Sequence, residues 1–392
     1  MNLDPSALPL YPPECWQGDQ TLLTWPSAAV LNSRQGKYPV GSEEWVRATI
    51  NAASTAAREG FALVSGIGLA TWELGVWAAG ESLGGIILLA GVPGSWPRIK
   101  RERHLQQILR EFTLSHQPAL VVPYIEKGKS PKAMWQQRDR WILDNARKLF
   151  PVSIRPGGFF DDALAESGFS LKSDTRFRIE YAPRRHRFSA LPTPEFAEKR
   201  LRRTEWEGWA VHWTRTSAGQ WPGELARSYY SDLAASENEP PRSALTTLAR
   251  ITTEKLIRGS GRHMPLGREM VGFTTLSPSE SLSLMRWRKR FVQVSFEPYG
   301  IAVRTDALLR GGARAIRYVS PEEAAKLEAS ERIFHQTVAN DRADWAKEAE
   351  LRWDGDLDLN RFESDEVRLI TLHEKEWNRL PASPWKRFSF ML

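Results

Sequence analysis

The stretch that most limits how this chain can fold is Phe61–Gly91, which has the pattern of a strand, a turn, a helix and a second strand. Phe61–Ser65 and Gly84–Ala90 are short apolar runs of the kind that is buried in a parallel sheet. Thr71–Gly80, between them, can form a helix. Two parallel strands joined by a helix place the intervening turn at the carboxyl edge of the sheet, where open α/β folds bind ligands.

The turn in this stretch, Gly66–Ala70, contains two glycines and can bring backbone N–H groups close to an anion at the start of the helix. Glu73 lies in the first turn of that helix. The helix dipole favours the ionised form of a carboxylate there, and a carboxylate nucleophile needs that form. A glutamate at this position is also common as a simple favourable end charge, so a catalytic and a structural role are both open.

Strands and helices alternate on both sides of this stretch, up to about residue 170. The other elements that the pattern predicts are, in chain order, a strand at Ala28–Leu31, a helix at Glu43–Glu59, a helix at Arg98–Ser115, a strand at Ala119–Tyr124, a helix at Pro131–Leu149, a strand at Val152–Ile154 and a short helix at Phe159–Glu166. This order is typical of an α/β fold with a doubly wound, Rossmann-like parallel sheet.

The pattern changes after residue 170, where short strands and helices follow in mixed order. The expected strands are Phe177–Tyr181, Val271–Thr275, Val292–Phe296 and Gly300–Val303, and the expected helices are Pro194–Arg203, Arg242–Leu256, Pro321–Ser330 and Asp341–Leu351. We therefore expect three parts: an N-terminal arm at 1–26, a Rossmann-like nucleotide or glycosidic-bond domain at 27–170, and an α+β domain, a candidate for DNA binding, at 171–392.

The composition is that of a globular protein with a positive charge excess. Hydrophobic residues make up 41% of the 392 residues and charged residues 26%. Cys15 is the only cysteine, which excludes an intrachain disulfide and a cysteine-based zinc site. The sequence has no signal-peptide pattern and no long apolar run, so we expect a soluble, cytoplasmic protein without a membrane partner. We also expect no metal and no cofactor. The net charge of +7 suggests a polyanionic partner.

Three loops of the first domain should meet at one edge of the sheet, because each follows a parallel strand. They are Asn32–Arg34, Gly66–Thr71 and Arg155–Gly158. Backbone amides and arginines beside a carboxylate are what a site for a phosphorylated nucleoside requires. The alternative is that glycine and arginine merely end these elements. The residues expected to bind substrate are Asn32, Ser33, Arg34, Gly66, Gly68, Thr71, Arg138, Arg140, Gly157 and Gly158.

Basic and aromatic residues are interleaved in four runs, Arg98–His104, Arg184–Phe188, Lys199–Arg203 and Arg286–Phe291. Lysine and arginine supply phosphate contacts, and aromatic rings supply stacking faces or wedges for an unstacked base. A charge run is also common on a solvated face that binds nothing. If the partner is DNA, the residues expected to contact it are Arg98, Lys100, Arg101, Arg184, Arg185, Arg187, Arg286, Arg288 and Lys289.

Several of these motifs resemble the superfamily of DNA-processing protein A, the lonely-guy phosphoribohydrolases and the nucleoside 2-deoxyribosyltransferases. Asn32-Ser33-Arg34 is similar to a Gly-Ser-Arg turn after the first strand of the DNA-processing members, Val64-Ser65-Gly66 to their second-strand Ser-Gly, and Arg138-Asp139-Arg140 to their Arg-Asn-Arg. Thr71–Ala78 is similar to the deoxyribosyltransferase segment in which a glutamate attacks the anomeric carbon. The resemblance covers roughly residues 27–165 and implies a catalytic role for Glu73.

One departure from the superfamily leaves the catalytic carboxylate open. The phosphoribohydrolases carry their glutamate after a Pro-Gly-Gly run, whereas Pro156–Gly158 is followed here by Phe159-Phe160-Asp161-Asp162. Asp161 or Asp162 could therefore serve in place of Glu73. In the second domain, His212–Thr214, Glu297–Ile301 and Trp345–Arg352 resemble a bacterial family found near phage-defence genes, and the pattern is also similar to ADP-ribosyltransferases. The alternative is that His212 pairs in a core and Glu348 and Glu350 lie on a solvated helix face.

The superfamily resemblance implies chemistry at an N-glycosidic bond, nucleotide sensing or single-stranded DNA binding. We expect a DNA glycosylase of phage defence that hydrolyses the N-glycosidic bond of a modified base and leaves an abasic site. The whole chain would then resemble anti-phage enzymes that act on glucosylated hydroxymethylcytosine, and on duplex DNA it would have to flip its target base. The alternatives are a nucleotide-sensing defence protein with an ADP-ribosyltransferase-like effector domain, and a non-catalytic single-stranded-DNA-binding protein.

Overall fold

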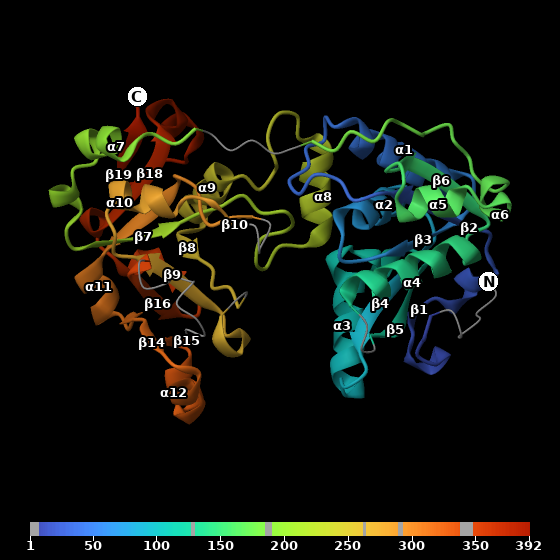
Figure 1. Cartoon of the computed structure of the whole chain (residues 1–392), viewed down its shortest axis with the longest axis horizontal. Helices are drawn as coiled ribbons and strands as arrows, with labels where there is room; N and C mark the ends of the chain where they lie inside the picture. The colour runs from blue at the N-terminus through green and yellow to red at the C-terminus, as the bar shows by residue number, and fades with distance from the viewer. Residues whose placement is uncertain (1–7, 127–129, 185–189, 262–263, 289–292, 338–347) are drawn as a thin grey trace. The chain divides into compact units, whose positions relative to one another are not determined.

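The structure is a computed structural model of the chain, and it describes residues 8–126, 130–184, 190–261, 264–288, 293–337 and 348–392. Its contacts divide into two units (Figure 1). Unit 1 consists of Met1–His186 and Ala218–Pro241, and unit 2 of Arg187–Ser217 and Arg242–Leu392. Residues 218–241, which follow the first segment of unit 2 in the chain, therefore complete the unit that holds the amino-terminal sheet.

Unit 1 is built on a six-stranded sheet in the order β1-β5-β4-β3-β2-β6. The strands are β1 (Gln17–Gly18), β2 (Ser27–Asn32), β3 (Ala62–Gly66), β4 (Ile86–Pro93), β5 (Ala119–Glu126) and β6 (Lys148–Ser153). All neighbours are parallel except β1, which pairs antiparallel to β5. The expected α/β class with a Rossmann-like, mostly parallel sheet is confirmed.

Both faces of this sheet are buried. Ala28 and Val30 of β2 belong to one core and Ala29 and Leu31 to the other, which is why the strands read as continuous apolar runs. The first face packs against α1 (Glu44–Arg58), α2 (Ala70–Glu81), α3 (Arg98–Glu111) and α8 (Ala226–Ala235). The second packs against α4 (Pro131–Asn145), α5 (Phe159–Leu164), α6 (Ser167–Ser170) and the N-terminal segment.

The boundary between α4 and β6 lies earlier than the sequence predicts. The helix expected at Pro131–Leu149 ends at Asn145, and the strand begins at Lys148 rather than Val152. Pro151 disfavours a strand at this position, because proline has no backbone N–H to donate to a neighbouring strand. It is tolerated because β6 pairs along its length only with β2, leaving its other side to the isolated bridges at Leu149 and Ser153.

Unit 2 contains a mixed seven-stranded sheet in the order β13-β16-β9-β7-β12-β18-β19, so the expected second α+β domain is confirmed as a fold. Its strands are β13 (Arg314–Ala315), β16 (Glu350–Asp354), β9 (Met270–Thr274), β7 (Trp209–Trp213), β12 (Gly300–Arg304), β18 (Val367–His373) and β19 (Lys386–Met391). Only β18 and β19 run parallel.

Helices and short two-stranded ladders surround this second sheet. The helices are α7 (Pro194–Arg200), α9 (Ala244–Glu254), α10 (Pro278–Ser281), α11 (Thr305–Arg310), α12 (Pro321–Lys326) and α13 (Ala329–Arg332). The ladders pair β8 (Leu256–Ile257) with β17 (Leu357–Asp358), β10 (Trp287–Arg288) with β11 (Gln293–Val294), and β14 (Arg317–Val319) with β15 (His335–Thr337). No helix in the described ranges has both the length and the apolar character that crossing a bilayer needs.

Two expected elements differ in the structure. Phe177–Tyr181 is not a strand; it is irregular chain of unit 1 that touches β6 through a bridge between Ser153 and Ile179. Glu350 and Leu351, expected to end a helix, lie in β16, while residues 341–347 of that helix fall outside the described residues. Pairing of β16 with β9, from Glu350 opposite Thr274 onward, overrides a local sequence that favours helix.

Candidate functional site

The order of the parallel strands places a topological switch point between β2 and β6. The chain winds outward from β2 through β3 and β4 to β5, and then returns across the sheet to β6 on the other side of β2. Connections from neighbouring strands therefore leave in opposite directions, and open α/β folds bind ligands beyond the carboxyl ends of the strands at such a point. The loops after β2 and β6 flank this switch point.

Asn32 and Ser33 tie the two strand ends together. Asn32 is buried; its Nδ2 donates to Thr49 Oγ1 at 2.9 Å and its Oδ1 accepts from the Ser153 amide at 3.3 Å. Ser33 Oγ accepts from the Arg155 amide at 2.9 Å. Asn32 and Ser33, both expected to bind substrate, thus link the ends of β2 and β6 by hydrogen bonds. Both side-chain polar atoms of Asn32 are hydrogen-bonded within the protein.

Four exposed arginines surround this switch point, and we call Arg34, Arg155, Arg178 and Arg184 the arginine rim. The Tyr181 hydroxyl donates to the Arg34 carbonyl at 2.8 Å. Arg178 and Arg184 belong to the same segment as Tyr181, which runs past β6. In the described part of the chain, no carboxylate lies within 4 Å of the guanidinium groups of Arg34, Arg155 or Arg184, and Arg178 has only Asp161, at 3.9 Å.

The segment that carries Arg184 is held close to the loop after β2. A Cβ added to Gly36 would lie 2.4 Å from the Arg184 carbonyl oxygen, so the close approach requires a glycine there. Two of the rim arginines were predicted from the sequence: Arg34 as a substrate-binding residue and Arg184 as a DNA contact. Arg155 and Arg178 complete the rim. Arg155 lay in an expected loop, whereas no motif distinguished Arg178.

Glu73 lies in the first turn of α2, next to the loop that follows β3, with both carboxylate oxygens bonded. Its Oε1 accepts from the Gly68 amide at 2.7 Å and its Oε2 from the Tyr230 hydroxyl of α8 at 2.6 Å. Gly68 adopts a φ of +92°, which favours glycine. Burial raises the pKa of Glu73, and it also raises the pKa of Tyr230, so the tyrosine stays a donor. Thr71, in the same helical turn, is buried.

Arg138 is fully buried and binds groups of its own unit. Its Nε and Nη2 donate to Asp139 Oδ1 at 3.0 and 2.8 Å, and its Nη1 donates to the Ile67 carbonyl at 3.1 Å. A Cβ on Gly66 would lie 2.7 Å from Arg138 Cζ, so Gly66 makes room for the guanidinium. Burial raises the pKa of Asp139 against the lowering effect of this pairing. Arg138 is therefore enclosed in the protein, whereas the rim arginines face solvent.

Arg140 and the residues after β6 occupy more exposed positions. Arg140 forms a two-pronged ion pair with Glu166 at 2.7 and 3.0 Å. Asp161 Oδ2 accepts from the amide of Gly157, which has a φ of +63°. Gly158 precedes α5, and Asp162 is exposed. The three candidate carboxylates thus lie in the first turns of two helices: Glu73 in α2, which follows β3, and Asp161 and Asp162 in α5, which follows β6.

The other residues expected to contact DNA are scattered over both units. Arg98 pairs with Glu102, Lys100 lies 4.2 Å from the centre of the Trp96 ring, and Arg101 lies 4.5 Å from that of Tyr11. Arg286 is exposed, and Arg288 is hydrogen-bonded to Glu348. Arg185, Arg187 and Lys289 lie outside the described residues.

The motifs of the second domain lie on or beside neighbouring strands of the unit 2 sheet. His212–Thr214 pairs directly with Glu297–Ile301, and Glu350–Arg352 in β16 lies one strand away from β7, across β9. His212 lies in β7, where its Nδ1 bonds the Gly272 carbonyl at 2.8 Å and burial lowers its pKa. Glu350 pairs with Arg352 at 2.7 Å, and Glu297 accepts from the Thr216 amide at 2.6 Å. Over the described ranges, no three histidine, cysteine, aspartate or glutamate side chains come together as a metal site.

A larger hollow lies at the opposite, amino edge of the unit 1 sheet. It measures about 740 Å³, and its lining includes Pro26, Phe61, Lys148 and Arg176, near the starts of β2, β3 and β6. Two of its four cations are paired with carboxylates: Lys148 bonds Glu59 and Asp174 at 2.9 and 3.0 Å, and Arg176 bonds the same two carboxylates at 2.7 Å each. This hollow therefore lies away from the switch point.

Comparison with known proteins gives a partial structural match. No protein-family model matches the chain, and no curated protein matches it. DNA processing protein A from Helicobacter pylori, in a study of its single-stranded DNA binding mode, is 17% identical over 40% of this chain and 68% of that one, with a TM-score of 0.30. DNA processing protein A from Streptococcus pneumoniae is 20% identical over 37% of this chain and 47% of that one, with a TM-score of 0.28. The chain thus has a partial structural similarity to DNA processing protein A over about 40% of its length.

Proposed function

We propose that unit 1 binds DNA as a single strand, through its phosphates, at the arginine rim. The observation that carries the proposal is the set of exposed guanidinium groups at the switch point that have no carboxylate partner in the described chain. Elsewhere in unit 1, Arg140, Lys148 and Arg176 are paired. Unpaired cations gathered at a ligand-binding edge favour an anionic partner, and guanidinium matches phosphate in charge and geometry.

The form of the rim favours an extended strand over a small nucleotide. Its four arginines come from three segments, the loops after β2 and β6 and the stretch 178–184, and all four are exposed. Successive phosphates of a strand can reach such cations one after another. Tyr181, held against the Arg34 carbonyl, adds an aromatic ring on which an unstacked base could lie. The net charge of +7 assists this binding.

The proposal is tested by the salt dependence of DNA binding. Binding of a labelled single-stranded oligonucleotide is measured by fluorescence anisotropy at several salt concentrations, for the full chain and for the triple variant R34A/R155A/R184A. Each lost phosphate contact lowers the slope of log K against log salt by about 0.7, so the triple variant should lose about 2. Arg58, exposed at the far end of α1, is the matched control: R58A should keep the slope.

Two results would contradict the proposal. An unchanged slope in the triple variant would exclude the rim as the phosphate-binding surface. Tighter binding of a duplex than of a single strand of the same length would keep the rim as a phosphate site but remove the preference for a single strand. A thermal unfolding midpoint close to that of the wild type shows that the triple variant is folded, since exposed substitutions change stability little.

A second candidate function is hydrolysis of an N-glycosidic bond in DNA, such as that of a modified base in phage DNA. Glu73 supports it, because it is a half-buried residue at the same sheet edge whose carboxylate is fixed by two donors and has a raised pKa. Its ionised form could stabilise an oxocarbenium-like transition state, and its protonated form could donate to the departing base. Asp161 and Asp162 are the alternatives for either role.

Hydrolysis is tested by incubating the full chain with DNA containing glucosylated hydroxymethylcytosine and with unmodified DNA, and then probing for alkali-labile abasic sites. If Glu73 carries the reaction, E73Q should abolish cleavage, whereas D161N and D162N should retain it. Loss in an aspartate variant with retention in E73Q would move the role to the loop after β6. Intact strands on every DNA that the wild type binds would exclude hydrolysis and leave binding alone.

A further inference from the structure

Unit 2 contains a small cavity with aromatic walls next to the β10–β11 ladder. Its volume is about 100 Å³. Trp287 of β10 and the neighbouring residues Phe296 and Tyr299, which precede β12, line it. Aromatic rings on several sides of a small space are suited to a flat ring, which can stack on one and meet the edges of the others.

Two of these rings are held in place from outside the cavity. Phe296 stacks on Trp213 with their centres 6.3 Å apart and their planes at 12°. The hydroxyl of Tyr299 donates to Glu376 Oε1 at 2.9 Å, which orients the ring. These two walls are therefore fixed before any ligand binds, and a fixed site loses less entropy on binding.

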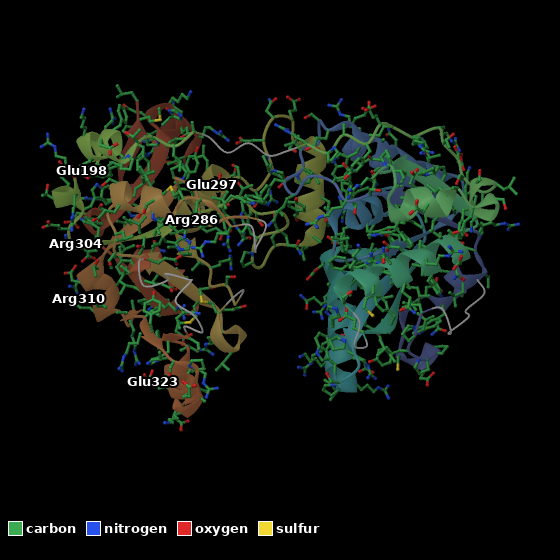
Figure 2. The ribbon with its side chains drawn as sticks, viewed as in Figure 1. Glu198, Arg286, Glu297, Arg304, Arg310 and Glu323 are labelled. Carbon is green, nitrogen blue, oxygen red and sulfur yellow. The ribbon has the colours of Figure 1, made fainter. Side chains whose placement is uncertain are left out.

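Glu297 and Arg286 also line this cavity, and their labels lie close together in Figure 2. The carboxylate of Glu297 accepts from the Thr216 amide at 2.6 Å, and burial raises its pKa. A carboxylate has about four acceptor sites, so acceptor capacity remains. Arg286 is exposed and places its charge on the solvent side. Within the described ranges neither charge has an ion-pair partner, and the two do not pair with each other.

The size of the cavity limits what it can hold. A closed cavity of about 150 Å³ is enough to bind benzene. At about 100 Å³ this cavity is smaller, so it can accept one six-membered ring only because its mouth is open, and a two-ring purine is too large. The arrangement of charge adds a second limit: the ligand needs a hydrogen-bond donor at its inner end and a negative charge at its outer end.

We propose that this cavity binds a cytidine nucleotide, with the pyrimidine ring between the aromatic walls, the exocyclic amine on Glu297 and the phosphate on Arg286. A carboxylate accepts well from the amine of cytosine. Thymine and uracil present a carbonyl oxygen at that position, and two acceptors facing each other repel. A quaternary ammonium ion also suits aromatic walls and a carboxylate, but Arg286 at the mouth disfavours a cation.

The test is calorimetric titration of the full chain with 5′-dCMP, 5′-dTMP and deoxycytidine at millimolar concentrations. The wild type should bind dCMP about tenfold more tightly than dTMP. E297Q, which presents an amide donor as well as an acceptor, should bring the two within about twofold. R286A should keep the preference for cytosine but lose the advantage of dCMP over deoxycytidine. E207Q and R202A remove charges from exposed positions of unit 2 outside this cavity and should behave as the wild type.

Equal binding of dCMP and dTMP by the wild type, or binding of neither, would overturn the proposal. Displacement of dCMP by tetramethylammonium at similar concentration would assign the cavity to a cation instead. The proposal does not depend on the arginine rim, which lies in unit 1: loss of strand binding in R34A/R155A/R184A leaves dCMP titration unchanged. Conversely, E297Q can lose base preference while the salt slope for oligonucleotides stays that of the wild type.

Discussion

The two edges of the unit 1 sheet carry similar numbers of cations but use them differently. At the amino edge, Lys148 and Arg176 share Glu59 and Asp174 in four contacts of 2.7–3.0 Å. At the carboxyl edge, Arg34, Arg155 and Arg184 have no carboxylate partner in the described chain. Paired charges contribute to holding the fold, whereas unpaired ones leave their binding capacity for another molecule.

The comparison also shows that neither volume nor charge alone identifies a site. The hollow of about 740 Å³ lies at the amino edge, where Lys148 and Arg176 are already paired with carboxylates. Lys172, which also lines it, donates to the carbonyls of Leu143 and Ala146 and so caps α4. A ligand there would have to compete with these internal bonds, and a ligand at the rim would not.

The largest effect should come from Arg138, the buried arginine of the carboxyl edge. Its side chain is 2% exposed and that of Asp139 is 13% exposed. R138M leaves the Asp139 carboxylate and the Ile67 carbonyl without their donor, and breaking a buried pair costs about 3–5 kcal/mol. Urea unfolding measures this loss. R140M, which removes a neighbouring but exposed pair, is the control and should lose far less; equal losses would show that Arg138 is not a structural residue.

The next largest effect should come from Tyr230, the donor to Glu73. Y230F removes a hydrogen bond to a carboxylate, which costs about 1.5–3 kcal/mol where that carboxylate is ionised. Glu73 already has a raised pKa in the folded state. The free energy of unfolding therefore falls as the pH rises from the pKa of Glu73 in the unfolded chain through its pKa in the folded protein. Without Tyr230 the folded pKa rises further and the fall extends to higher pH.

Urea unfolding over a pH series separates this effect from a simple packing loss. In an E73Q background the charge is absent, so Y230F should cost less and its cost should not depend on pH in this range. A penalty for Y230F that stays constant from acid to neutral pH in the presence of Glu73 would contradict a role for Tyr230 in holding the ionised carboxylate. Both variants keep the packing of α8 against α2 nearly unchanged.

The sheet of unit 1 could be predicted because its signals are local. Apolar runs such as Ala62–Gly66 and Ile86–Pro93, each followed or preceded by an amphipathic helix, identify strand and helix without knowledge of distant contacts. Their parallel order then fixes which loops share an edge. At Pro151 the apolar run favours a strand and the proline disfavours one, and there the predicted start of β6 was several residues too late.

The chemistry of the candidate site could not be predicted in the same way, because it depends on distant partners. From the sequence, Arg34 and Arg138 were both expected to bind substrate. In the structure, Arg138 is enclosed by Asp139, Gly66 and Ile67, whereas Arg34 faces solvent. Tyr230 reaches Glu73 across 157 residues of chain, from a helix that no motif connects to the amino-terminal sheet. Burial and pairing decide a charged residue's role, and they are properties of the fold.

A smaller effect is expected from Arg176 at the amino edge. Its hydrogen bonds lower the pKa of Asp174 well below the usual range. A lowered folded pKa stabilises the protein above the unfolded value, and that stability is lost as pH falls toward the folded value. In R176A the pKa of Asp174 moves back toward normal, so the loss of stability below about pH 4 should be shallower than in the wild type. Urea unfolding between acid and neutral pH checks this, with R58A as the unpaired control.

The smallest expected effect, no change, tests the comparison most directly. K148M/R176M removes two cations from the amino edge, as R34A/R155A removes two from the carboxyl edge. Because Lys148 and Arg176 are already bonded to Glu59 and Asp174, they have no free charge to offer a phosphate, and the salt slope for single-stranded DNA should stay that of the wild type. A fall of about 1.4, the value for two lost phosphate contacts, would show that DNA displaces the internal carboxylates. Ion pairing of the cations in the free protein would then not distinguish the sheet edge that stabilises the fold from the edge that binds DNA.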